Sequence, residues 1–518
     1  MYQALLTRRY LFSKIMPLLA SVAVLLCTCM VIVIWSVMGG FLNMLIGTGR
    51  TLTGDVSIIW PTTGFRHYED LIARLEKDPM VAAAAPMIEA PGMIRLPDGR
   101  NEWVLIRGIE GGSYAKVTEY EDILWWKPLD KPMPKDTLGE DPRLPRTIPD
   151  DPTHLTREFA QQLYDNGLNL ERTNPATGVA EPAVVLGMEV SRFNQRELGG
   201  FYTPRTRAVP QPDGSIKFLD MFLPRSGQVT LNVLPTDTTG KGIETATAIF
   251  PVANEFQSGL YETDKQVVLV RLDALQKMLR MQAYTAAPQQ EMSGDEGFAA
   301  APEAGPVEVP GRVTHVLVRG AGSEENSAEL KARVQQIYDQ FAREHRGDVP
   351  EFPTIATWRE MNGTFITAVE KETALVLVLF CLVSLVAVVL VLSIFWSMVA
   401  EKTKDIGILR AMGASRTGVA WIWVRYGLAI GIVGAITGAA AAWGIVHNIN
   451  PIHEWMGRAM DIQIWDPRVY YFIQIPNQVN YTHMAIVMAG FVLSCAVGAA
   501  IPAGRAAMLH PVRALRFE

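Results

Sequence analysis

Residues Thr373–Ala400 read TALVLVLFCLVSLVAVVLVLSIFWSMVA, without a charged side chain, and Glu401–Ser415 follow directly as EKTKDIGILRAMGAS. A helix crosses the core of a lipid bilayer with about 20 apolar residues. The first stretch therefore predicts a membrane-spanning helix, and the second predicts a short segment at the membrane surface.

Three further runs are apolar and long enough to span a membrane: 15–46, 419–446 and 482–503. A cleaved signal peptide has a shorter apolar core of about 7–15 residues, so we expect the first run to remain as a helix. A buried helix of a soluble core is the alternative for any one run. Together with 373–400, the runs instead predict a membrane protein with four transmembrane α-helices.

The short segments on one side of these runs are basic, as is typical of cytoplasmic loops. We therefore expect residues 1–14, 401–418 and 504–518 to be cytoplasmic, and 47–372 and 447–481 to lie outside. The basic residues are Arg8, Arg9, Lys14, Lys402, Lys404, Arg410, Arg416, Arg505, Arg513 and Arg516.

The segment 47–372 mixes strand-like runs with helical periodicities, which predicts a large α+β extracytoplasmic domain. The runs expected as strands are Asp55–Ile59, Trp103–Ile109, Ala183–Leu186, Val229–Leu234, Gln266–Leu272 and Thr314–Arg319. The runs expected as helices are Tyr68–Lys77, Leu272–Met281 and Ser327–Glu344. Residues 127–152 and 286–310 are expected to be loops because of their Pro-rich composition.

Composition and motifs argue against several function classes. The net charge of −6 gives no support for a nucleic-acid partner. The phosphate loop GxxxxGK[ST], the zinc motif HExxH and the nucleophile elbow GxSxG do not occur. All four cysteines lie in predicted spans, where they are expected to be apolar fillers. We therefore predict no catalytic residue, cofactor site or metal site, and we expect that the chain is not an enzyme.

Glycines recur at helical spacing in two of the predicted spans. Small residues on one helical face let a second helix approach closely, so both rows predict helix packing. The alternative is scattered glycine on a lipid-facing helix. The glycines concerned are Gly427, Gly431, Gly434 and Gly438 in the third span, and Gly490 and Gly498 (with Ser494 between them) in the fourth.

The segment after Ala400 is amphipathic, with Ile406, Leu409 and Met412 at spacings of three and charges on the other faces. Gly413 is suited to end that helix in the left-handed conformation. Such a helix at the membrane surface fits the groove of a partner protein. A connecting loop that rests on lipid headgroups is the alternative.

These residues resemble the FtsX/MacB-type permeases of ABC transporters, and among them the lipoprotein-releasing LolC/LolE type. The motif after the second span is EKxxxIGILRxxGAS, from Glu401 to Ser415. Further matching stretches are Arg9–Leu11, Ser36–Phe41, Ser258–Asp264 with Val267–Val270, Thr357–Glu360 with Asn362, Ala503–Arg505 and Pro511–Arg516.

The resemblance implies a MacB-like periplasmic core domain, an inner-membrane location, and two permease subunits, identical or homologous, that work with two copies of an ABC ATPase. ATP and magnesium would then bind the ATPase, and the cargo would be a lipoprotein taken from membrane lipid. The residues that this assigns to ATPase coupling are Glu401, Lys404, Ile406, Leu409, Arg410, Met412 and Gly413. Those assigned to a transmission segment are Trp358, Arg359, Glu360 and Asn362.

The chain departs from this family in places. Met361 stands where a polar residue is expected, and Leu234–Thr245 lacks a match to the hairpin that recruits a periplasmic carrier in some members. The alternative function is that of an FtsX-like signalling subunit, which activates a cell-wall hydrolase without moving cargo. FtsX itself usually has a much smaller outer domain, so the length of 47–372 favours the first function.

Overall fold

The computed structural model describes residues 15–50, 52–128, 157–196, 202–204, 206–210, 216–235, 244–286, 307–322, 327–460, 475 and 477–508. The chain divides into two compact units. We call the first the helix unit; it comprises residues 1–44, 365–465 and 474–518. The second is the sheet unit, which comprises residues 45–364 and 466–473.

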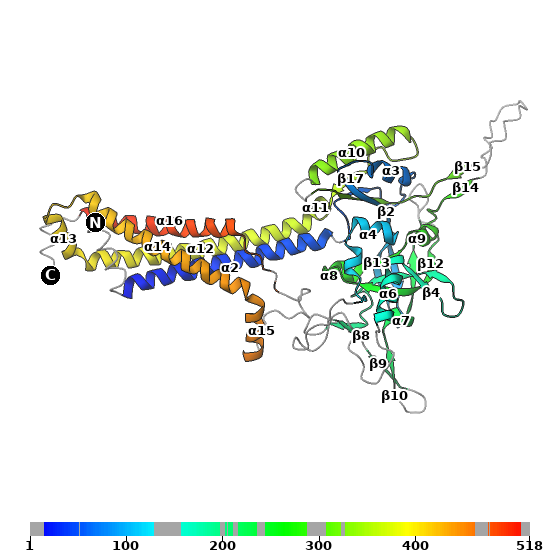
Figure 1. Cartoon of the computed structure of the whole chain (residues 1–518), viewed down its shortest axis with the longest axis horizontal. Helices are drawn as coiled ribbons and strands as arrows, with labels where there is room; N and C mark the ends of the chain where they lie inside the picture. Colours follow the sequence, from blue (N-terminus) through cyan, green and yellow to red (C-terminus); the bar gives the residue numbers. More distant parts are fainter. Residues whose placement is uncertain are drawn as a thin grey trace, which may run out of the picture. The chain divides into compact units, whose positions relative to one another are not determined.

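The helix unit is built from long helices that run alongside one another (Figure 1). They are α2 (Ile15–Arg50), α12 (Gly363–Glu401), α14 (Arg416–His447) and α16 (Tyr481–Met508). The short helices α13 (Thr403–Ala411) and α15 (Ile449–Met460) lie on either side of α14 in the sequence. One buried apolar cluster joins the long helices, with Val24, Phe395, Ile430 and Cys495 among its members.

Among the described residues, α2, α14 and α16 are long and apolar enough to cross a membrane. α12 has 39 residues, and many of its leucine and valine side chains are exposed rather than packed against the other helices, such as Leu375, Leu382 and Val389. The prediction of a membrane protein with a large soluble α/β region is confirmed. The count of four spans remains a prediction.

Some helices extend beyond the runs expected from the sequence. α12 begins at Gly363 rather than Thr373, and α16 continues to Met508 rather than ending near Ala503. α15 lies inside the segment 447–481, which was expected to be a loop. Apolar runs mark only the part of a helix that lies in lipid, so they do not show where its polar ends continue.

The sheet unit contains a nine-stranded sheet in the order β11-β12-β6-β13-β3-β2-β16-β1-β17. Its strands are β1 (Val56–Ile59), β2 (Val81–Arg95), β3 (Asn101–Ile109), β6 (Val184–Gly187), β11 (Gln228–Val233), β12 (Ala246–Phe256), β13 (Val267–Arg271), β16 (His315–Gly320) and β17 (Thr354–Thr357). β11 also pairs with β2, so the six strands from β11 to β2 form a closed ring. The pairs β12–β6 and β13–β3 are parallel, and the other pairs in the sheet are antiparallel.

Helices pack around this sheet, and short two-stranded sheets extend from it (Figure 1). The helices are α3 (Tyr68–Leu75), α4 (Gly111–Val117), α5 (Tyr120–Ile123), α6 (Arg157–Asn169), α7 (Leu223–Ser226), α8 (Tyr261–Gln266), α9 (Leu272–Leu279), α10 (Ser327–Glu344) and α11 (Trp358–Met361). The small sheets pair β4 (Glu171–Thr173) with β5 (Ala180–Pro182), β7 (Asn194–Arg196) with β8 (Tyr202–Pro204), β9 (Thr206–Pro210) with β10 (Ile216–Asp220), and β14 (Tyr284–Ala286) with β15 (Val307–Val309).

The six runs expected as strands and the three expected as helices are all present, with ends that differ by a few residues. β13 reads VVLVR, and its valines are buried because one apolar cluster covers each face of the strand, with Val268 and Val270 in the first and Val267 in the second. Most of the two expected loops, 127–152 and 286–310, lies outside the described residues. β2, the longest of the described strands, was not predicted, because its run of alanines and its prolines Pro86 and Pro91 are uncommon in strands.

A buried polar cluster lies beside β12. The carboxylate of Glu255 accepts hydrogen bonds from Trp126 Nε1 and Asn194 Nδ2, each at 2.9 Å. Burial raises the pKa of Glu255 from its ordinary value of 4.5 to about 7, although these hydrogen bonds act in the opposite direction. This carboxyl group therefore holds a proton in the folded chain at a pH where an exposed glutamate is ionised.

Candidate functional site

The junction between α12 and α14 is a compact helical turn built on α13. Gly413 has φ of +93°, and its N–H donates to the carbonyl of Arg410 at 3.2 Å. The N–H of Ala414 donates to the carbonyl of Leu409 at 3.1 Å, which completes a Schellman motif. The prediction that Gly413 ends this helix is confirmed. Ser415 then caps α14, since its Oγ accepts from the N–H of Gly418 at 3.1 Å.

One apolar residue of α13 fixes the turn to its neighbours. Ile406 is buried and packs with Val399 of α12 and Val419 of α14. The apolar stripe expected from the sequence included Ile406, which is buried rather than exposed; the coupling role expected of this residue stays a prediction. The side chain serves packing within the unit because α12 and α14 approach α13 on that face.

The surface of α13 instead presents residues at a spacing of four. Ile408 is 49% exposed and Met412 is 79% exposed, and Lys404 lies one turn before them. The sequence analysis missed Ile408 because it followed a spacing of three; the spacing of four from Lys404 would have found it. Glu401 is also exposed, and Leu409 is half-buried. We call Lys404, Ile408 and Met412 the α13 surface.

Arg410 lies beside this surface with part of its guanidinium group unsatisfied. Its Nη1 donates to the carbonyl of Ala414 at 3.4 Å. Its Nε is buried and has no hydrogen-bond partner among the described residues. A buried donor without a hydrogen-bond partner costs about 1–3 kcal/mol.

The expected transmission segment lies at the edge of the sheet. Thr357 and Glu360 form a capping box, and Glu360 also accepts from Lys331 Nζ at 2.7 and 2.8 Å.

Trp358 is buried, and its N–H donates to the carbonyl of Asp55 in the turn before β1. Arg359 is exposed, and Asn362 Nδ2 donates back to the carbonyl of Trp358 at 3.0 Å. α11, which directly precedes α12 in the chain, is therefore fixed to the sheet.

The glycine row of α14 touches two helices in succession. A Cβ atom on Gly427 would lie 2.5 Å from Ala499 Cβ, and one on Gly431 would lie 3.0 Å from Cys495 Cβ, both on α16. A Cβ atom on Gly434 would lie 2.7 Å from Val24 Cβ, and one on Gly438 would lie 2.7 Å from the carbonyl oxygen of Leu25, both on α2.

The two glycines of α16 that were expected to pack against a helix do not resemble those of α14. A Cβ atom on Gly490 would meet no atom within 4 Å, and one on Gly498 would only reach the carbonyl oxygen of Val388 at 4.0 Å. The packing expected at these glycines has no counterpart among the described residues. α16 meets α14 through Cys495 and Ala499 instead, a row of small residues that the sequence analysis did not identify.

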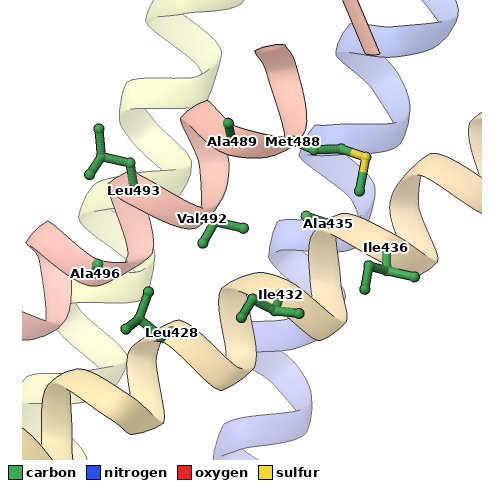
Figure 2. A pocket seen from close by; sticks show the side chains of 9 residues that line it. All are labelled: Leu428, Ile432, Ala435, Ile436, Met488, Ala489, Val492, Leu493 and Ala496. Carbon is green, nitrogen blue, oxygen red and sulfur yellow. The ribbon is translucent and has the colours of Figure 1, made fainter. Parts of the chain in front are cut away.

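A groove of about 440 Å³ lies between α14 and α16 (Figure 2). Leu428 and Ile432 of α14 lie on one side of it, and Val492 and Leu493 of α16 lie on the other. Every lining side chain is apolar, so the groove offers no acid, base or nucleophile. The described residues also contain no group of three or more His, Cys, Asp or Glu side chains that could hold a metal ion.

Residues 377–511 match the family model described as FtsX-like permease C-terminal. The chain carries an FtsX-like permease domain. The matched region contains α13, α14 and α16, and thus the whole junction described above. The resemblance to FtsX/MacB-type ABC permeases close to LolC/LolE is confirmed.

The sequence is also similar to two LolC proteins and one LolE protein. The chain is 22% identical over 283 residues to the lipoprotein-releasing system transmembrane protein LolC of Xylella fastidiosa, which covers 55% of this chain and 59% of that protein. It is 28% identical over 169 residues to LolC of Haemophilus influenzae, and 22% identical over 168 residues to LolE of that organism. Each of the latter alignments covers 32% of this chain and 40% of the relative. The chain thus spans between two and three fifths of the length of these relatives.

Proposed function

We propose that this chain is the permease subunit of an ABC transporter that releases lipoproteins from the inner membrane. ATP hydrolysis then takes place on a separate ATPase, which also holds the magnesium ion. The names of the similar LolC and LolE proteins support the lipoprotein-release class. In this proposal α2, α12, α14 and α16 all span the membrane, with both termini and α13 in the cytoplasm and the sheet unit outside.

The observation that carries this proposal is the α13 surface. A short helix held rigidly between two long apolar helices exposes a cation and two apolar side chains, Ile408 and Met412. An exposed apolar pair of this kind fits a hydrophobic groove, which the ATPase would supply.

Motion of α13 would reach the sheet unit along α12. This helix has 39 residues, and its first turn follows directly on the capped segment at Trp358. Removing a lipid anchor from a membrane costs about 0.8 kcal/mol per CH₂ group. Several acyl chains therefore require work on the scale of ATP hydrolysis, which an ATPase would supply.

The test is reconstitution of the full chain with its ATPase and second permease in lipid vesicles that carry a labelled lipoprotein. We expect release that depends on ATP, with an acceptor carrier in the outer solution. Arg410→Glu, which alters the junction and leaves the spans intact, should release less lipoprotein than the unchanged chain. ATP hydrolysis without any release of lipoprotein would contradict the proposal and favour the signalling function.

A further inference from the structure

α15 follows directly on a helix that is long enough to cross a membrane. The 32 residues of α14 extend over about 48 Å at a rise of 1.5 Å per residue, whereas the bilayer core is about 30 Å thick. The end of α14 thus reaches the membrane surface, on the side opposite to α13. α15 turns away from the axis of α14 at this point (Figure 1).

The sequence INPIHEWMGRAM of α15 separates into an apolar and a polar face. Its apolar residues recur at spacings of three and four. They are Ile449, Ile452, Trp455, Met456, Ala459 and Met460. Of these, Ile452 is 37% exposed and Trp455 is 63% exposed.

One polar side chain near the start of α15 contacts another segment of the helix unit. Asn450 Oδ1 accepts from the N–H of Ile475 at 2.9 Å, and Asn450 Nδ2 donates to the carbonyl of Ile475 at 3.4 Å. A helix on a soluble protein would do the reverse, burying its apolar face and exposing its polar face. The apolar face of α15 therefore lies towards an apolar medium.

Other aromatic side chains lie at the same end of the helix unit. Trp443 of α14 is 48% exposed and stacks on His447 at a centroid distance of 5.3 Å. Tyr481, the first residue of α16, is 66% exposed. Trp and Tyr are enriched where membrane proteins cross the headgroup layer, so this end has the composition of a membrane interface.

We propose that α15 is an interfacial helix, with Ile452 and Trp455 inserted among the lipids of the outer leaflet. Lipid is the occupant because α15 starts where a membrane-spanning helix leaves the bilayer. Its one acidic and one basic residue, Glu454 and Arg458, cancel in charge. Binding is therefore hydrophobic and does not depend on anionic lipid.

The test places nitroxide labels on the full chain after Cys27, Cys29, Cys381 and Cys495 have been replaced by alanine. Single cysteines are introduced as Ile452→Cys and, in a separate chain, Trp455→Cys. Two reference positions calibrate depth: Ile436→Cys on the exposed face of α14, and Glu158→Cys on the surface of α6. Collision rates are measured with oxygen, which concentrates in lipid, and with a nickel chelate, which stays in water.

We expect an oxygen-to-nickel ratio at 452 and 455 that lies between the reference values and exceeds the value at 158 roughly threefold or more, since an interfacial helix is only partly immersed. Vesicles of neutral phosphatidylcholine and vesicles with added phosphatidylglycerol should give the same ratio. A ratio equal to that at 158 would place α15 in water and overturn the proposal. Protection from both reagents would also overturn it, because protein, from this chain or a second copy, would then cover the face.

Discussion

The helix unit and the sheet unit achieve close packing in different ways. In the helix unit, α14 approaches its neighbours at positions where a side chain is absent, such as Gly427 and Gly438. In the sheet unit, the interior accepts polar groups such as Glu255 and Asn254, which are buried but hydrogen-bonded. The difference follows from the surroundings. Lipid gives helices no hydrophobic reason to associate, so close contact at small residues becomes important. Water drives the sheet unit to bury apolar area, and the polar groups in that interior are hydrogen-bonded.

The largest expected effect tests the role of absent side chains. Gly438→Leu should prevent α14 from packing on α2, because even a Cβ atom there would lie 2.7 Å from a backbone oxygen that cannot move aside. Overpacking of this kind costs about 1–3 kcal/mol or more. Gly490→Leu is the matched control, since no atom lies within 4 Å of its Cβ position. Thermal unfolding in detergent should separate the two variants, and equal losses would refute the difference between α14 and α16.

The second prediction concerns the buried polar groups of the sheet unit. Between about pH 4.5 and pH 7 the folded chain keeps a proton on Glu255 that the unfolded chain releases, because burial raises its pKa to about 7. The contribution of Glu255 to stability is therefore greatest below this window and falls as the pH rises through it, by about 3 kcal/mol in total. Denaturant unfolding followed by tryptophan fluorescence measures this, and Glu255→Gln should remove that part of the pH dependence. An unchanged pH profile in the variant would show that Glu255 is not responsible.

The third prediction concerns the junction, where a packed face and an unsatisfied donor occur on one helix. Arg410→Glu and Gly413→Pro should each lower ATP-dependent lipoprotein release roughly tenfold while membrane insertion is kept. The first removes the hydrogen bond from Arg410 to the carbonyl of Ala414. The second disrupts the turn that ends α13. Proline cannot adopt the φ of +93° at position 413 and lacks the N–H that bonds to Arg410. Gly444→Ala, which has open space around it, is the control. Normal coupled activity in both variants would exclude α13 as the docking helix.

The smallest expected effect concerns the start of α12. Thr357→Ala removes the Oγ1 that accepts from the N–H of Glu360 at 3.2 Å, and loss of such a cap costs about 1 kcal/mol. Thr357→Ser keeps the hydroxyl group and should unfold at nearly the wild-type temperature. If both variants lose the same stability, then loss of the methyl group of Thr357, rather than loss of the cap, is the cause.

The sequence predicted the features that follow from local pattern. The apolar runs marked the helices, and Gly413 marked the end of α13, because a left-handed residue at a helix end is a local requirement. The sequence did not show that Ile406 faces inward and Ile408 faces outward, since both residues are apolar. Only the approach of α12 and α14 distinguishes the two positions. β2 was missed for a similar reason, since its neighbours β3, β11 and β16 hold an alanine-rich segment in a strand.

α12 differs from the other long helices in one respect that bears on its mechanical properties. After its first residue, Gly363, it contains no glycine and no proline, whereas α2, α14 and α16 each contain several such residues. Glycine and proline are common causes of sharp kinks, so α12 lacks two common causes of a bend. In the function proposed above, α12 would carry a tilt from Glu401 to Gly363 without bending at a glycine or proline.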